Sequence, residues 1–136
     1  MLRSEMSAVL GKLEVLEARS FSAPQVEAWF EILGQHSADD AIDAVLKFHS
    51  KPFKRPAYPG DIKALIAEVE AIRLRRCGTV EANEADLLGC DRTVANARLH
   101  GLIATAQWSA SEYREYRRSK LSIDGFMSPR GALPVG

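Results

Sequence analysis

Residues 25 to 66 read QVEAWFEILGQHSADDAIDAVLKFHSKPFKRPAYPGDIKALI, and this stretch decides the fold class. Its apolar residues recur at spacings of three and four, which is the period of an amphipathic helix rather than of a strand. Helix-start signals precede the periodic runs: Ser22 and Ser37 are suited to cap a helix, and Pro59 suits a first turn. The stretch therefore predicts three consecutive helices, the last two joined by a proline-rich loop.

The same pattern continues on both sides of this stretch. Residues 4 to 19 carry one apolar stripe, and the helix that begins at Pro59 is expected to end at Gly78. Further on, residues 81 to 90 favour a short helix with Leu87 and Leu88 inward. Two more helices are expected, one from Asp91 to a stop at Gly101 and one capped by Ser109 or Ser111.

These patterns predict an all-α protein, a compact bundle of about six to seven short helices with a flexible C-terminal tail. We expect a four-helix domain over residues 1–76 and additional helices over residues 77–121. Residues 122–136 combine glycine, proline and serine, which predicts a flexible tail without a helix.

Composition restricts the class of protein. The chain has 136 residues, 46% of them hydrophobic, and a formal net charge of zero, which is typical of one soluble globular domain. No apolar run is long enough to span a membrane and no signal peptide is evident, so a cytoplasmic location is expected. Residues 1 to 70 carry a net charge of −3 and residues 71 to 136 one of +3, which hints at a partner surface in the C-terminal half.

The sequence offers little for catalysis. His36, His49 and His100 are isolated from one another, and none lies in a motif that supplies a nucleophile or a metal ligand. Cys77 and Cys90 form no zinc motif and are expected to be reduced thiols. We therefore expect no enzyme, no metal and no cofactor.

Two stretches are candidates for binding. The first is the loop at residues 47–61, where basic and aromatic residues alternate and could contact a partner or a nucleic acid; the alternative is a stiff connector with solvated lysines. Its candidate residues, with the arginines near the end of the following helix, are Lys51, Phe53, Lys54, Arg55, Tyr58, Arg73, Arg75 and Arg76.

The second stretch, residues 84–104, resembles an excisionase-like helix-turn-helix that ends in Gly-Leu-Ile. The resemblance implies that the second helix would enter the major groove of DNA. The turn is one residue shorter than usual, which would rotate Val94 away from the core; two packed structural helices are the alternative. The DNA-binding candidates are Arg92, Thr93, Asn96 and Arg98, together with Arg114, Arg117 and Arg118 on the last helix.

A broader resemblance covers residues 22 to 75. Trp29 and Leu33 lie on one helix, the next contains Ala-x-x-Ala-Val at residues 41–45, and Pro59-x-Asp61-Ile opens the next. This layout resembles the helical N-terminal domain of bacteriophage replicative-helicase loaders and replisome-organiser proteins. The resemblance implies an accessory protein of phage or prophage DNA replication that binds a hexameric helicase or an initiator.

Three functions stay open on the sequence. The first is a replication adaptor that binds helicase or initiator through protein surfaces, which the zero net charge favours. The second is a DNA-binding regulator built on residues 84–104, and the third is a phage-encoded inhibitor of a host protein. A protein partner is expected in the first and third, and DNA in the second.

Overall fold

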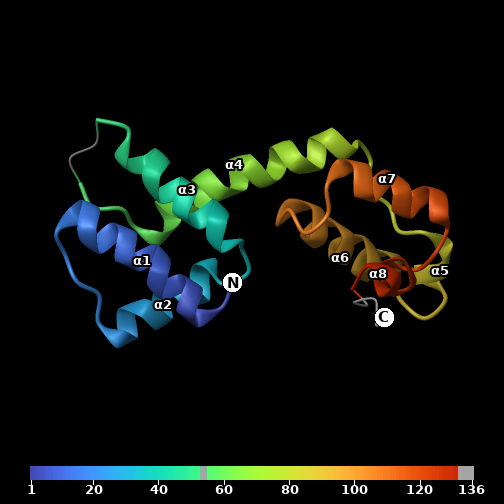
Figure 1. Cartoon of the computed structure of the whole chain (residues 1–136), viewed down its shortest axis with the longest axis horizontal. Helices are drawn as coiled ribbons and strands as arrows, with labels where there is room; N and C mark the ends of the chain where they lie inside the picture. Colours follow the sequence, from blue (N-terminus) through green and yellow to red (C-terminus); the bar gives the residue numbers. More distant parts are fainter. Residues whose placement is uncertain (53–54, 132–136) are drawn as a thin grey trace, which may run out of the picture. The chain divides into compact units, whose positions relative to one another are not determined.

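The chain is all-α, as the sequence predicts. The computed structural model describes the backbone of residues 1–52 and 55–131 and the side chains of residues 1–52 and 55–128, and within these ranges it contains no strand (Figure 1). The helices are α1 (Arg3–Glu17), α2 (Ala23–Leu33), α3 (Ala38–His49), α4 (Pro59–Cys77), α5 (Glu84–Leu87), α6 (Arg92–Ala104), α7 (Ala110–Ser119) and α8 (Ile123–Gly131).

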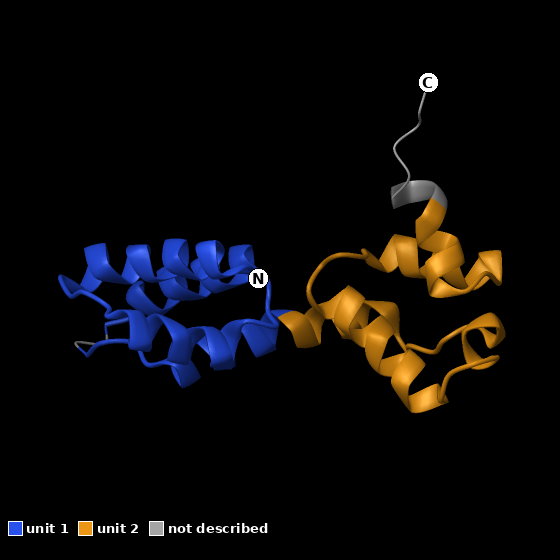
Figure 2. Cartoon of the chain, turned by 90° about the horizontal axis from the view of Figure 1, so that it is seen from below, with its two compact units in different colours: residues 1–69 blue, residues 70–136 orange. Residues whose placement is uncertain are grey.

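The chain forms two compact units, residues 1–69 and residues 70–136 (Figure 2). The division lies inside α4, whereas the sequence analysis placed it at the end of that helix. The reason is that α4 contributes side chains to the hydrophobic cores of both units. Ile62, Leu65 and Ile66 belong to the core of unit 1, while Leu74 and Cys77 pack against the core of unit 2.

Unit 1 follows its sequence signals closely. The Ser22 side chain accepts from the backbone N–H of Gln25, and the Ser37 side chain accepts from that of Asp40, so both predicted caps are present. The apolar face that α3 buries consists of Ala41, Ala44, Val45 and Phe48, whereas Leu46 is 48% exposed. The buried stripe of α3 therefore ends on the aromatic residue, which brings a larger apolar side chain into the core.

Unit 2 departs more from its sequence signals. The predicted stop at Gly101 is wrong, because α6 continues to Ala104. Leu102 and Ile103 are buried in the core of this unit, and their burial stabilises the additional helical turn. This stabilisation outweighs the weak helix propensity of glycine. The prediction that Leu88 points inward is also wrong, since its side chain is 89% exposed. Leu88 follows the last residue of the four-residue helix α5 and takes no part in the core.

The expectation of no helix after Ser122 is wrong for α8. The Ser122 hydroxyl accepts from the backbone N–H of Gly125 at 3.0 Å, so it caps the first turn. Ile123 is buried, and the Phe126 ring lies 5.3 Å from that of Trp108 between centroids. These contacts offset the glycine that weakens the helix. Residues 132–136 lie outside the described part of the chain, so a flexible tail stays a prediction there.

Candidate functional site

The arginine of the proline-rich loop, Arg55, bonds to residues of unit 1 itself. The Arg55 guanidinium forms two bonds to the Asp61 carboxylate, at 2.8 and 2.9 Å, and lies over the Phe48 and Tyr58 rings. Asp61 also accepts from the backbone N–H of Tyr58 at 2.8 Å, at the start of α4. Arg55 therefore fixes the helix start, a role that the sequence analysis had assigned to Pro59 and Asp61 alone.

The charge of Asp61 is correspondingly stabilised. The side-chain hydrogen bonds from Arg55, with the backbone N–H of Tyr58, lower the pKa of Asp61 from its ordinary 3.8 to about 2. Of the other loop candidates, Lys51 and Tyr58 are exposed. Phe53 and Lys54 lie outside the described residues.

The three arginines of α4 divide into two kinds. Arg73 is partly buried and donates to the backbone carbonyl of Ala104 at 2.7 Å, so it ties α4 to the end of α6 within unit 2. Arg75 and Arg76 are exposed. Arg76 lines a cavity of about 280 Å³ together with Arg73 and Trp108. Arg75 and Arg76 remain candidate partner residues, whereas Arg73 has a structural contact.

The helix-turn-helix candidates are only partly presented to solvent. The Asn96 side chain accepts from the backbone N–H of Ala82 at 2.7 Å, and the Arg98 guanidinium pairs with both carboxylate oxygens of Asp124, at 3.2 and 2.6 Å. Arg92 and Thr93 are exposed in the first turn of α6. Val94 is 60% exposed, in agreement with the rotation that the short turn predicts.

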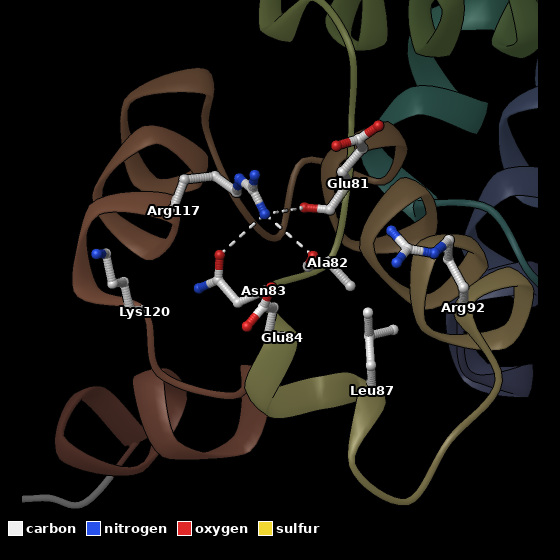
Figure 3. Close-up of a pocket in the computed structure, with 8 residues that line it drawn as sticks. All are labelled: Glu81, Ala82, Asn83, Glu84, Leu87, Arg92, Arg117 and Lys120. Atoms are coloured by element: carbon white, nitrogen blue, oxygen red, sulfur yellow. Dashed lines mark hydrogen bonds between the residues drawn. The ribbon is translucent and has the colours of Figure 1, made fainter.

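The α7 arginines also differ from one another. Arg114 and Arg118 are exposed, and the Arg118 Nε donates to the Arg114 carbonyl at 3.4 Å. Arg117 instead donates to the carbonyls of Glu81 and Ala82 and to the side chain of Asn83, at 3.0 to 3.1 Å (Figure 3). No local sequence signal indicates this role, because the acceptors are more than thirty residues away.

A buried polar network lies beside these contacts. The Tyr116 hydroxyl accepts from the backbone N–H of Asn83 at 2.7 Å and donates to the Asp86 carboxylate. The other Asp86 oxygen accepts from the backbone N–H of Ile123 at 2.8 Å. Burial and the hydrogen bond to Asp86 raise the pKa of Tyr116 far above its usual value. Every group named has a partner, so the arrangement holds α5, α7 and α8 together.

Unit 1 also contains a buried polar cluster, which is centred on a carboxylate. The carboxylate of Glu17 is buried and lies 2.7 Å from the His49 Nε2, 2.9 Å from the Arg19 guanidinium and 2.7 Å from the backbone N–H of Ala57. The cluster joins the ends of α1 and α3 to the loop before α4. His49 is thus a hydrogen-bonded histidine. A carboxylate that is hydrogen-bonded to His49 and to the backbone of Ala57, and that forms an ion pair with Arg19, is suited to a structural role.

Apolar side chains are exposed around the turn between α5 and α6. We call Leu88, Cys90 and Val94 the α5–α6 apolar surface. Beside it lies a cavity of about 230 Å³, lined in part by Gly89, Cys90 and Val94. The sequence pattern does not reveal this surface as a whole, because Leu88 is expected to point inward and residues 84–104 are expected either to bind DNA or to form two packed structural helices. The exposure of Leu88 is visible only in the structure, whereas that of Val94 follows from the short turn.

A larger cavity of unit 2, about 510 Å³ in volume, is shown in Figure 3. It lies over the extended residues 81–83 and the start of α5, between the start of α6 and the end of α7. It brings together two of the predicted DNA-binding residues, Arg92 and Arg117, with Lys120, which the sequence analysis had not selected. Its lining residues are Glu81, Ala82, Asn83, Glu84, Leu87, Arg92, Arg117 and Lys120.

In comparisons with known proteins, no family model, no curated protein and no solved structure matches the chain. The resemblances to helicase loaders and to excisionase-like domains are therefore still hypotheses. Within the described residues, no group of His, Cys, Asp and Glu side chains is arranged to hold a metal ion. In that same part of the chain, every helix is too short or too polar to cross a membrane.

Proposed function

We propose that this protein is a protein-binding adaptor of phage or prophage DNA replication, which binds a replicative helicase or an initiator. The observation that carries the proposal is the α5–α6 apolar surface. Leu88 and Val94 expose most of their side chains beside a cavity. Exposed apolar groups gathered at a hollow are typical of surfaces that bind proteins.

The same region is poorly suited to reading DNA. Recognition in the major groove needs polar side chains free to reach base edges. Asn96 and Arg98 are instead bonded to Ala82 and Asp124, and Val94, which precedes both along the helix, exposes an apolar side chain. The helix before the turn, α5, has only 4 residues, whereas a helix-turn-helix positions its reader against a first helix that crosses the backbone.

Charge gives the proposal further support. A DNA-binding domain commonly has a strong excess of positive charge. This chain has a formal net charge of zero, and Arg55, Arg73, Arg98 and Arg117 all bond to groups of the protein itself. The choice of a helicase or an initiator as the partner rests on the resemblance of residues 22 to 75 to helicase loaders.

The test is a pull-down of the tagged chain from bacterial host lysate with nuclease added, followed by mass spectrometry. Recovery of the replicative helicase or an initiator by the unmodified chain is expected. Leu88→Ser and Val94→Ser should each reduce that recovery about tenfold, the effect of losing roughly 1.4 kcal/mol of contact. Val15→Ser is the matched control, because Val15 is an equally exposed aliphatic residue in unit 1.

Three outcomes would contradict the proposal. Recovery of an unrelated host enzyme in place of a helicase or initiator would indicate an inhibitor. Retention of proteins only when nuclease is omitted would identify DNA as the partner. Equal losses with Val15→Ser and Leu88→Ser would show that the α5–α6 apolar surface is not the contact.

A further inference from the structure

We propose that the 510 Å³ cavity of unit 2 binds a short peptide segment of a protein partner. In this proposal an apolar side chain of the peptide lies against Leu87 and Ala82, and acidic side chains face Arg92 and Lys120. The inference rests on the proposed function in one respect: the segment is taken to belong to the adaptor's partner. It adds a second contact to the α5–α6 apolar surface.

The cavity has opposing basic walls and a small apolar patch between them. Arg92 lies on the α6 side, Arg117 and Lys120 lie on the α7 side, and Ala82 and Leu87 lie between them (Figure 3). Leu87 packs against the core of unit 2 on one side and lines the cavity on the other. An apolar anchor between charged flanks is the usual layout of a peptide-binding site.

The backbone under the cavity is already occupied. The N–H groups of Glu81, Ala82 and Asn83 donate to the Tyr113 hydroxyl, the Asn96 side chain and the Tyr116 hydroxyl, at 2.7 to 2.9 Å. These donors are unavailable for pairing with an added strand. A ligand must therefore be held by side chains, on a segment that is fixed before the ligand arrives.

The cations that face the cavity are not equivalent. One guanidinium nitrogen of Arg117 already donates to the backbone carbonyls of Glu81 and Ala82 and to the side-chain oxygen of Asn83. Arg92 and Lys120 are exposed, and the structure gives neither an ion-pair partner among the residues it describes. These two are the charges that a ligand carboxylate would meet.

Mixed charge in the lining favours a peptide over a nucleic acid. The carboxylates of Glu81 and Glu84 line the same cavity, and a continuous chain of phosphates could not avoid them. A peptide can place its carboxylates opposite the cations alone. In addition, none of the eight lining residues is aromatic, so the cavity offers no platform on which a base could stack.

The experiment measures binding of fluorescently labelled probes to the full chain by anisotropy. The probes are a short peptide of alternating leucine and glutamate, the same peptide with glutamine for glutamate, and an oligo-dT strand. The leucine–glutamate peptide should bind, and the glutamine peptide about tenfold more weakly. Nuclear magnetic resonance of the unmodified chain should show the largest amide shifts at residues 81–92 and 117–120.

Charge reversal then identifies the cations. Arg92→Glu and Lys120→Glu should each weaken binding of the leucine–glutamate peptide about tenfold. Arg114→Glu and Arg118→Glu are matched controls, because they place the same charge change on exposed positions of α7 outside the cavity lining. Circular dichroism of each variant verifies that the fold is kept.

Several results would overturn the inference. The inference is wrong if the peptide fails to bind or if oligo-dT binds more tightly than the peptide. It is also wrong if the largest amide shifts occur elsewhere in the chain, or if the control variants lose as much binding as Arg92→Glu and Lys120→Glu.

The proposed function can fail independently of the peptide site. If the helicase or initiator is recovered equally by the unmodified chain and by Arg92→Glu, the adaptor stands and the peptide site does not. If the peptide binds and no helicase or initiator is recovered, the site stands and the adaptor function does not.

Discussion

The two units of this protein differ in the interactions that stabilise the interior of each one. In unit 1, four helices bury apolar stripes against one another, and residues such as Leu13, Leu33 and Ile66 are fully buried. In unit 2, side chains of α6 and α7 also bond to the extended backbone of residues 79–83. Tyr113, Tyr116, Arg117 and Asn96 all take part.

This difference accounts for the position of the 510 Å³ cavity in unit 2. An extended segment lined by polar side chains leaves space above it, and the 510 Å³ cavity lies there. The following predictions test whether the two units do depend on different interactions, in order of decreasing effect.

Leu33→Ala should have the largest effect, and it should act on unit 1. Leu33 is fully buried, so its truncation should lower the free energy of unfolding by about 3 kcal/mol through lost transfer energy and an unfilled cavity. Each unit contains one tryptophan, Trp29 or Trp108. Urea unfolding followed by Trp29 fluorescence in a Trp108→Phe background measures the shift. An equal shift reported by Trp108 in a Trp29→Phe background would show that the units unfold as one.

Tyr116→Phe should be the strongest conservative change in unit 2. It keeps the ring and removes the hydroxyl that bonds to Asn83 and Asp86, leaving buried polar groups without a partner. The expected loss of unfolding free energy is about 2 kcal/mol. Trp108 fluorescence in the Trp29→Phe background reports it. Tyr58→Phe is the control, since Tyr58 is exposed; similar costs for both would contradict the role of the network.

Asp61→Asn should have a smaller effect that depends on pH. Because the folded pKa of Asp61 is about 2 and its ordinary value is 3.8, its charge stabilises unit 1 above about pH 4. That contribution is lost as pH falls through about 2. Asp61 is partly exposed, so the contribution at neutral pH should be under about 1 kcal/mol.

The measurement is the unfolding free energy of the unmodified chain minus that of Asp61→Asn, from pH 7 to pH 2. The difference should shrink on acidification. Asp43→Asn, at an exposed position of α3, controls for a general change in charge. A difference that stays constant over this range would contradict the ion pair with Arg55.

Arg98→Ala should have the smallest effect of the four. The Arg98–Asp124 pair is well formed, but its side chains are 49% and 78% exposed. Solvent screening and the entropy of two long side chains limit such pairs, so the expected loss is under about 0.5 kcal/mol. Thermal unfolding at low and high salt measures it. A loss that exceeds that of Tyr116→Phe would show that α8 is held by charge rather than by Ile123 and Phe126.

Part of the candidate site was predictable from sequence. The helices that carry it, the Asp91 cap of α6 and the Ser109 cap of α7 follow from local signals and were predicted. Arg92 and Arg117 were selected as candidates, although for DNA. The cavity between them was not predictable, because it depends on where residues 81–84 lie relative to α7.

The sequence by itself determined the helical class, most helix starts and most of the apolar core of unit 1. These depend on signals within one or two turns of the chain: a cap, a proline, or apolar residues three or four apart. Only the tertiary structure decided the inward position of Asn96, the exposure of Leu88, the helix α8 and the role of Arg117. The bonds of Asn96 and Arg117 join groups 14 to 36 residues apart, and the energy of burying a side chain depends on which neighbours the fold brings to it.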